Sequence, residues 1–384
     1  MSLSSQRINY RKSSRTSAFA GFDPILTIAV ALLLLMGTLL VYAATRNWYA
    51  ANGLDPEYYL KRHILNILIG LLLAAGAMSI DYRLLRAYTP ILWGLSVLGL
   101  VAVLIPAFGD SVNGARAWIS LPGGLQIQPA EFAKIAIIVG MSMILAEKRE
   151  GSQDPTSLDV LQSLAVAAIP LLLIIAQPDL GTAIIISAAV VTIIAASGAQ
   201  TRWPLGLLSL SGIGAYVAIK IGVLDEYQLK RLQSFVDPTA DPQSTGYQLR
   251  QARITIGSGG FFGKGLFNGP QTNGRFVPEQ QTDFIFTVAG EELGFLGCIF
   301  ILALYSIVLW RALVIARRSN DIFGRLVCIG IMAWFGFQIF ENIGMAVGLA
   351  PITGVPLPFL SYGGSSMFAS LIAVGLLLNV HSRR

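Results

Sequence analysis

The chain has 384 residues, of which 54% are hydrophobic and 12% charged, whereas ordinary globular proteins carry about 25% charged residues. So few charges cannot cover a water-soluble surface. The net charge of +6 is spread between apolar blocks, which favours membrane topology over nucleic-acid binding. The two cysteines, Cys298 and Cys328, lie inside apolar blocks. We therefore expect free, buried thiols and neither a disulfide framework nor a metal site built on cysteine.

The apolar residues form ten blocks of roughly the length that spans a bilayer, which is about 20 residues, so we predict an all-α polytopic membrane protein. Residues 1–23 are polar and basic, and no small-residue cleavage site follows the first block, so we expect a cytoplasmic tail and a retained first helix. The rest of residues 1–384 is expected to form one membrane domain. The predicted spans are 24–44, 62–80, 88–107, 131–147, 160–177, 180–197, 204–224, 283–310, 322–349 and 361–380.

Lys and Arg predict the orientation, because cytoplasmic connections are enriched in them. With both termini inside, the short outer connections hold only Arg46, Lys61, Arg62 and Arg116. The long connection 225–282 is then extracellular. Its apolar residues recur at helical spacing, so we expect short amphipathic helices at the membrane surface.

Four polar stretches lie on the outer side in this topology, and charges at membrane depth are functional candidates by default. The first, "NGARAWISLPGGLQIQPAEFAKI" (113–135), places Glu131 and Lys134 on one helix face if the span begins near Pro129. The pair is either a structural ion pair or a holder of an anionic group. The second, "QPDLGT" (177–182), offers Asp179 as a helix cap or as a site residue.

The third stretch runs from "GSGGFFGKG" (257–265) to "PEQQTDFIF" (278–286). The glycines are either an ordinary loop or a nest of N–H groups for phosphate, with Lys264 beside it. At the head of the next span, Thr282 or Asp283 is either a helix cap, which would lower the pKa of Asp283, or part of a desolvated site, which would raise it. Further along, at least one of Glu291 and Glu292 should face a polar cavity.

The fourth stretch, "PITGVPLPFLSYGGSS" (351–366), is too rich in proline and glycine for one lipid-facing helix. Irregular backbone at membrane depth is tolerated only against protein or an aqueous cavity. We interpret the stretch as a re-entrant loop that lines the site, with a plain external loop as the alternative.

Together these stretches resemble the SEDS family of bacterial cell-wall proteins, which includes RodA, FtsW and their sporulation relatives. The resemblance covers about residues 24–380 and rests on "NGARAWI", "IQPAEFAKI", "QPDLGTA", "DPTADPQSTGYQLRQARITIGSGGFFGKGLFNGPQ", "FVPEQQTDFIF", "EELGFLG" and "GVPLPFLSYGGSS". The segment "GSGGFFGKGLFNGPQ" is more similar to RodA, the elongation protein, than to FtsW, the division protein.

The resemblance implies a peptidoglycan glycosyltransferase that polymerises lipid II on the outer face of the plasma membrane. The implied partner is a class B penicillin-binding protein, a crosslinking transpeptidase, within the elongation machinery. The aspartate of the family's "TDFI" motif falls on Asp283, the expected catalytic base. The substrate-binding candidates are Glu131, Lys134, Asp179, Trp118, Arg116, Lys264, Glu279, Thr282 and Ser361.

Two positions depart from the family pattern. Many members have histidine directly before "TDF", where this chain has Gln281, and many have the basic residue directly before the tryptophan, where this chain has Ala117. Positive charge for the leaving pyrophosphate is expected from Lys134, Arg116, Lys264 or a divalent cation (Mg²⁺ or Mn²⁺), although no residue cluster specifies a metal site. A lipid II flippase and a scaffold for the transpeptidase are the alternatives in other functional classes.

Overall fold

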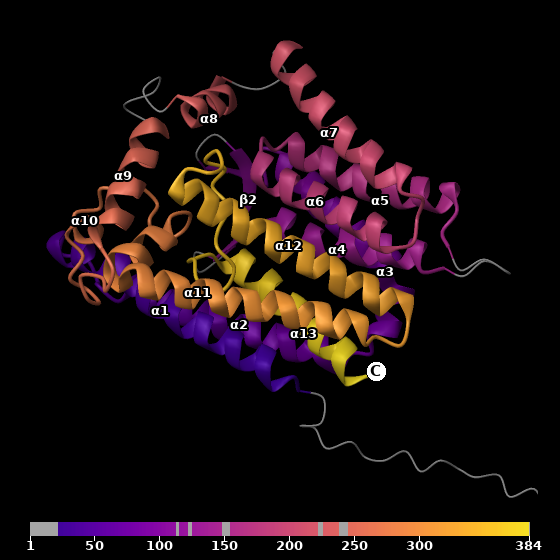
Figure 1. The fold of residues 1–384 in the computed structure, drawn as a ribbon, viewed down its shortest axis with the longest axis horizontal. Helices are drawn as coiled ribbons and strands as arrows, with labels where there is room; N and C mark the ends of the chain where they lie inside the picture. The colour runs from indigo at the N-terminus through magenta and orange to yellow at the C-terminus, as the bar shows by residue number, and fades with distance from the viewer. Residues whose placement is uncertain are drawn as a thin grey trace, which may run out of the picture.

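The computed structural model describes residues 22–112, 115–121, 125–147, 154–221, 226–237 and 245–383. It is a bundle of long helices with shorter elements gathered at one end (Figure 1). The elements are α1 (Pro24–Ala51), α2 (Tyr58–Ser79), α3 (Tyr82–Leu104), β1 (Asp110–Val112), β2 (Ala115–Leu121), β3 (Leu125–Ile127), α4 (Pro129–Leu145), α5 (Ser157–Ile175), α6 (Leu180–Ala196), α7 (Arg202–Ile221), α8 (Glu226–Val236), α9 (Thr245–Ser258), α10 (Pro270–Asn273), α11 (Ile285–Arg317), α12 (Ile322–Val347) and α13 (Gly364–Ser382).

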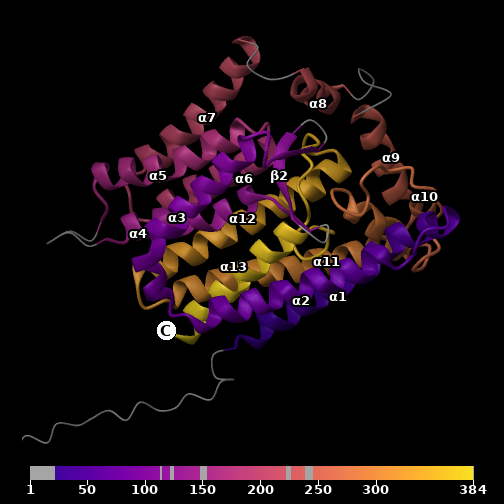
Figure 2. The same cartoon turned by 180° about the vertical axis from the view of Figure 1, so that it is seen from behind.

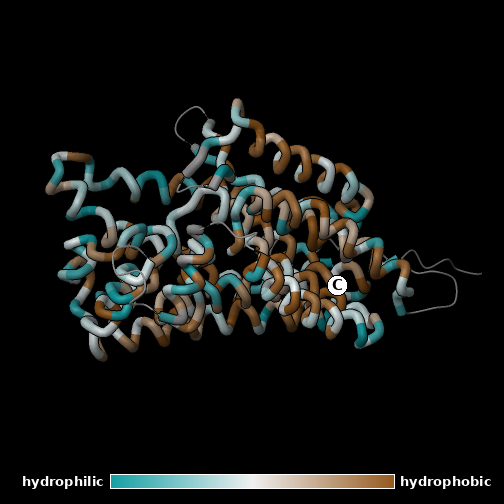
Figure 3. Tube along the Cα trace, turned by 90° about the horizontal axis from the view of Figure 1, so that it is seen from above, coloured by the Kyte–Doolittle hydropathy of each residue, from teal (hydrophilic) through white to brown (hydrophobic). Residues whose placement is uncertain are grey.

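The ten predicted spans are all helices. Eight helices in the described part of the chain are long and apolar enough to cross a membrane, and α4 and α6, with 17 residues each, complete the set. Apolar residues cover the bundle, while hydrophilic residues gather toward its ends (Figure 3). Leu72 and Leu98 are among many large apolar side chains that point outward, which is the surface that lipid requires. The chain is a multi-pass membrane protein.

Local signals explain where several helices begin and end. Pro24 and Pro129 occupy the first turns of α1 and α4, where a missing N–H costs nothing. A capping box of Thr156 and Asp159 starts α5. Gly348 ends α12 in the left-handed conformation, with φ of 83°, as helix C-termini often do.

Helix α12 lies at the centre of the bundle. It packs against α4 and α6 on one side and against α11 and α13 on the other, and Figures 1 and 2 show it between these two groups. Helix α2 packs against α13, and α1 packs against α11. Both predicted thiols, Cys298 and Cys328, are buried and free.

One end of the bundle, here called the loop end, carries the three strands, helices α8 to α10 and the irregular segment 351–363. Helices α8 and α9 confirm the predicted short helices in the long connection. The antiparallel sheet β1–β2–β3 was not predicted. Trp118 and Ile119 in β2 are aromatic and β-branched residues, which favour strands.

The start of α1 and the end of α13 meet at the opposite end, as an even number of spans requires. Asp23 is fully buried there. Its Oδ2 atom accepts hydrogen bonds from Nε (2.9 Å) and Nη2 of Arg311 in α11, and His381 Nδ1 of α13 lies 3.6 Å from the same oxygen. This ion pair joins the first helix to the last ones.

We predict that Arg311→Met will lower the free energy of unfolding by about 3–5 kcal/mol, because a buried carboxylate loses its main partner. The double variant Arg311→Met/Asp23→Asn should lose clearly less, since Asn still caps α1 and carries no charge. Thermal unfolding in detergent measures both. Equal losses in the single and double variants would contradict the importance of the unpaired charge.

Candidate active site

The irregular segment 351–363 is buried in protein at the loop end. Val355, Leu357 and Leu360 are each at most 4% exposed, so the plain external loop is excluded and the re-entrant interpretation is favoured. Side chains from three helices donate hydrogen bonds to its main-chain carbonyls. They are Arg231 Nη1 to Thr353 O (3.1 Å), Asn342 Nδ2 to Val355 O (2.7 Å), Gln338 Nε2 to Pro356 O (2.7 Å) and Tyr305 Oη to Pro358 O (2.5 Å).

Asp283 stands in a tight turn just before α11. The main-chain N–H groups of Thr282, Asp283 and Phe284 all donate to the carbonyl of Glu279, whose φ of 50° is left-handed. The N-cap of α11 is Phe284, and no side chain caps the helix. The cap interpretation of Thr282 and Asp283 is therefore wrong. Thr282 instead donates its hydroxyl to Glu279 O at 3.1 Å.

Gly354 of the re-entrant loop lies against the Asp283 side chain. A methyl group on Gly354 would lie 3.2 Å from Asp283 Oδ2 and 4.0 Å from Arg231 Nη1. Because φ of Gly354 is 79°, a glycine suits the position on conformational grounds as well. The loop thus brings the carboxylate and the guanidinium to the same small residue.

Desolvation by the surrounding protein raises the pKa of Asp283 to about 7. The negative charge of Glu279 adds to this rise, whereas Arg231 and the hydroxyl of Thr282 oppose it. Burial lowers the pKa of Arg231, and the charges of Asp283 and Asp179 counter that effect. A carboxylate with a pKa near neutrality can both accept and release a proton under physiological conditions.

Glu131 and Lys134 form a buried ion pair in the first two turns of α4. Both side chains are at most 3% exposed, and the Lys134 ammonium lies 2.9 Å from the Glu131 carboxylate. It also donates to Gln338 Oε1 at 3.1 Å and lies 4.5 Å from the ring centre of Trp334. The pair is therefore tied to α12 as well as to its own helix.

Asp179 caps α6, as its position allowed. Its Oδ1 accepts from the N–H of Thr182 at 3.0 Å. Its Oδ2 accepts from Nε2 of Gln128, the residue just before α4, at 3.0 Å. A methyl group on Gly181 would meet Val355 Cγ1 at 2.5 Å, so the start of α6 touches the re-entrant loop. Asp179 thus belongs to the same neighbourhood as Asp283 and Arg231.

The glycine-rich loop is used for structure rather than as a phosphate nest. The N–H groups of Lys264 and Gly265 donate to the carbonyls of Glu291 and Glu292, and that of Gly263 donates to Gly259 O. They meet α11 where it is kinked at Gly294, with φ of 67°. The phosphate-nest alternative is therefore wrong for these donors. The Lys264 side chain is exposed.

Glu291 is fully buried and holds the start of α10. It accepts hydrogen bonds from the N–H groups of Gln271 and Thr272, at 2.9 and 2.7 Å. The hydroxyls of Ser258 and Thr272 also donate to it, at 3.1 and 2.7 Å. Glu291 is eight residues beyond Asp283, or about 12 Å along a helix. Its role in the described structure is to fix the loop around α10.

The remaining predicted residues are placed differently. Arg116 and Trp118 lie in β2, where the pairing with β1 is irregular: Trp118 pairs with Asp110 and Arg116 with Ser111. Strand β2 packs against α3 and α4. Ser361 is buried, and its hydroxyl oxygen accepts the N–H of Leu357 at 2.8 Å. Glu279 is exposed and accepts from Gln281 Nε2 at 3.2 Å. Ser361 and Glu279 therefore shape the loops around Asp283.

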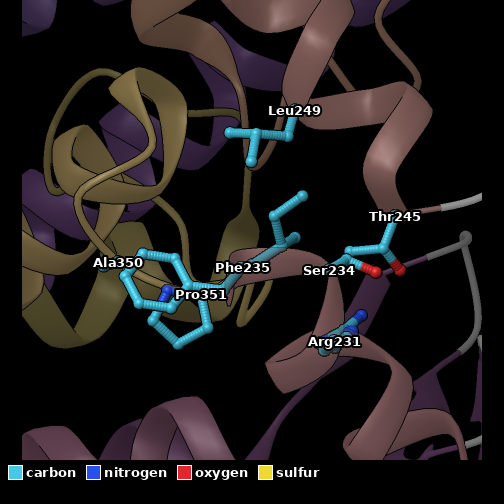
Figure 4. A pocket seen from close by; sticks show the side chains of 8 residues that line it. Arg231, Ser234, Phe235, Thr245, Leu249, Ala350 and Pro351 are labelled. Carbon is cyan, nitrogen blue, oxygen red and sulfur yellow. The ribbon is translucent and has the colours of Figure 1, made fainter. Parts of the chain in front are cut away.

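Three residues of the site were missed by sequence reasoning. Arg231 lies in the long connection 225–282, for which the sequence predicted only short helices at the membrane surface. Gln338 and Asn342 are fully buried in α12, and two amides four residues apart in an apolar span are a signal that could have found them. Arg231 also lines a shallow pocket, between α8, α9 and residues 350–352 (Figure 4).

In the described part of the chain, no group of three or more His, Cys, Asp or Glu side chains is arranged to hold a metal ion. One helix, α12, contacts both the ion pair on α4 and the turn that carries Asp283. Carboxylates and cations both lie around the re-entrant loop. This arrangement suits a reaction in which a proton is transferred and the substrate carries negative charge.

Comparison with known proteins identifies the family of the chain. A family profile described as "Cell cycle protein", covering FtsW, RodA and SpoVE proteins, matches residues 24–384. The chain is 40% identical over 94% of its length to the probable peptidoglycan glycosyltransferase FtsW of Trichlorobacter lovleyi, covering 93% of that protein. It is 39% identical over 93% of its length to stage V sporulation protein E of Bacillus subtilis, covering 96% of it, and 37% identical over 92% to peptidoglycan glycosyltransferase MrdB of Escherichia coli K12, covering 93% of it.

Two solved structures are similar over 94% of this chain. One, titled "Structural coordination of polymerization and crosslinking by a peptidoglycan synthase complex", has a TM-score of 0.77 at 31% identity, with 97% of that chain covered. The other, the rod shape determining protein RodA of Thermus thermophilus, has a TM-score of 0.69 at 29% identity, with 97% covered. On this evidence, the chain belongs to the SEDS family, the family of the FtsW, RodA and SpoVE proteins.

Proposed function

We propose that the protein polymerises lipid II into peptidoglycan glycan strands, with Asp283 as the general base. It is a peptidoglycan glycosyltransferase, as its relatives are named. The observation that carries the assignment of the base is the Asp283 carboxylate, which lies against Gly354, the residue that Arg231 also approaches, and whose pKa is raised to about 7. Gln281, two residues earlier, cannot exchange a proton as a histidine would, so Asp283 carries the base role alone.

In the proposed reaction, Asp283 takes the proton from the 4-hydroxyl of the acceptor N-acetylglucosamine. That oxygen forms a bond to C1 of the lipid-linked N-acetylmuramic acid of the growing strand. The bond from C1 to the phosphate oxygen breaks, undecaprenyl pyrophosphate leaves, and the anomeric centre inverts from α to β. A base on the attacking side is what an inverting transfer needs.

The leaving pyrophosphate needs positive charge nearby, because negative charge develops on it as the bond breaks. Arg231 and Lys134 are the cations that the site brings into the neighbourhood of Asp283 and Asp179. The guanidinium of Arg231 donates to Thr353 O of the re-entrant loop and lies within electrostatic reach of Asp283 and Asp179. Lys134 is fixed by Glu131 and Gln338, so it would act as an oriented charge rather than as a mobile one.

We place the loop end on the outer face of the plasma membrane, where lipid-linked sugar would reach Asp283. The Lys and Arg bias of the connections supports this orientation. The partner is proposed to be a class B penicillin-binding protein. A similar solved structure, whose title describes a complex that coordinates polymerization and crosslinking, supports that pairing.

A flippase remains the alternative from another class. The candidate residues favour the enzyme: Glu131 and Lys134 lie in the first turns of α4, Asp179 at the start of α6 and Asp283 before α11. Transporter sites usually lie near the midplane at broken helices. A scaffold without activity would have no use for a carboxylate tuned to a neutral pKa.

We expect Asp283→Asn to lower strand polymerisation from purified lipid II by about 10²–10⁴-fold, the usual contribution of a general base. Products would be followed on gels, with and without the transpeptidase partner and divalent cation. The matched control is Asp55→Asn, an exposed carboxylate near the loop end that pairs with Lys61 and should leave polymerisation intact. Retained activity in a well-folded Asp283→Asn protein would remove Asp283 as the base. Movement of labelled lipid II across proteoliposomes without polymer would favour the flippase.

The rate should rise with pH through about 7, because the base must be deprotonated and its pKa is raised to about 7. Glu279→Gln removes a charge that raises this pKa, so the rise should move to lower pH. Arg231→Gln removes a charge that lowers it, so the rise should move to higher pH. Initial rates between about pH 5 and 9, roughly two units on either side of this pKa, measure both shifts. Shifts in the same direction for both variants would contradict the assigned charges.

Cell elongation and rod shape are proposed as the biological role, on the RodA-like segment "GSGGFFGKGLFNGPQ". The relatives compared above include division, sporulation and MrdB proteins at nearly equal identity, so this role rests on the segment. Expression in rod-shaped cells depleted of either RodA or FtsW gives the test. We expect the protein to restore rod shape in cells depleted of RodA. If it instead restores division in cells depleted of FtsW without restoring rod shape in cells depleted of RodA, its role is in division.

A further inference from the structure

Asn342 of α12 joins the catalytic turn to the re-entrant loop. The side chain is fully buried, and its Nδ2 atom lies 2.7 Å from Asp283 O and 2.7 Å from Val355 O. Both neighbours are carbonyl oxygens, which only accept hydrogen bonds. The NH₂ group of the amide must therefore face them and donate one hydrogen to each.

The two donations fix Asp283 from the side opposite to its turn. The N–H of Asp283 is already held by Glu279 O, so Asn342 adds a hold on the carbonyl of the same residue. Val355, the other acceptor, directly follows Gly354, the residue against which the carboxylate lies. One amide thus sets the distance between the backbone of Asp283 and the loop that its side chain faces.

Gln338, one turn earlier on α12, makes the parallel connection for the ion pair. Its Nε2 donates to Pro356 O at 2.7 Å, and its Oε1 accepts from Lys134 at 3.1 Å. Residues four apart on a helix are separated by about 6 Å along its axis. The same face of α12 therefore holds the base through Asn342 and the cation through Gln338.

The oxygen of the Asn342 amide is the informative detail. It is buried, and among the described residues it accepts no hydrogen bond. Buried polar atoms are normally satisfied, and an exception asks for an explanation. Here the amide orientation that serves Asp283 and Val355 is kept although it leaves the oxygen unpaired.

We propose that Asn342 is a positioning residue for the reaction: it holds the backbone of Asp283 against the re-entrant loop so that the carboxylate reaches the acceptor hydroxyl. The inference rests on the proposed role of Asp283. Asn342 itself need not touch substrate. Its loss should displace the base and slow the chemical step, while substrate binding by other residues continues.

A matched control exists in the same protein. Asn379 in α13 is also fully buried, and its Nδ2 donates to two main-chain carbonyls, Ala77 O at 2.6 Å and Ile80 O. It lies at the opposite end of the bundle from Asp283. Asn342→Val and Asn379→Val both remove a donor to two carbonyls. Asn379→Val also removes the oxygen that accepts from the Tyr82 N–H and from Arg383 Nε, so thermal unfolding in detergent should show at least as large a loss of stability for Asn379→Val as for Asn342→Val.

Steady-state polymerisation from lipid II by the full chain with its transpeptidase partner gives the test. We expect Asn342→Val to lower kcat by about 10- to 100-fold with KM changed less than about twofold, because a displacement of about 1 Å can cost on the order of 10²-fold. Asn379→Val should keep kcat within about twofold.

Equal kcat for Asn342→Val and Asn379→Val would overturn the proposal, as would a loss confined to KM. Asp283→Asn distinguishes a failure of the positioning role of Asn342 from a failure of the base role of Asp283. An inactive Asp283→Asn together with a normal Asn342→Val would overturn the positioning role and leave the base in place. An active Asp283→Asn would overturn both.

Discussion

The site depends on one constraint: the buried main-chain carbonyls of residues 353–358 need hydrogen-bond donors. Pro356 and Pro358 prevent this segment from closing a helix, yet it is buried among apolar spans where water cannot satisfy it. An unpaired buried carbonyl costs about 1–3 kcal/mol. Side chains from α8, α11 and α12 must therefore reach the loop. Arg231 of α8 is itself a charged group of the site. Gln338 and Asn342 of α12 contact Lys134 and the backbone of Asp283 with the same side chains that reach the loop.

This shared use links groups that are far apart in sequence. Arg231 satisfies Thr353 O and at the same time lies near Asp283 and Asp179. Asn342 satisfies Val355 O and the carbonyl of Asp283 with one amide. A change in the loop would consequently affect the positions of Asp283 and of the Arg231 guanidinium together. The opposing effects of Glu279 and Arg231 on the pKa of Asp283 arise from the same arrangement.

The fold could be predicted from the sequence because span length and apolar content are local properties. The start of α4 at Pro129 and the cap of α6 by Asp179 also follow from nearby residues. The site could be predicted only in part. The sequence predicts that Asp283 either caps the helix or belongs to the site. The turn that holds it depends on the left-handed backbone of Glu279 and on a hydrogen bond from Asn342, which is distant in sequence. The donors of the glycine loop meet the kink at Gly294, which no local pattern reveals.

A broken loop serves this chemistry better than a continuous helix would. In a helix the carbonyls of residues 353–358 would be paired within the segment, and Arg231, Gln338 and Asn342 would have no reason to converge on it. The base role proposed for Asp283 needs surroundings dry enough to disfavour the negative charge, and it needs a polar sugar hydroxyl to reach the carboxylate. Gly354 meets both needs. It covers one side of the Asp283 carboxylate without a side chain, and it leaves that carboxylate half-buried at the loop end.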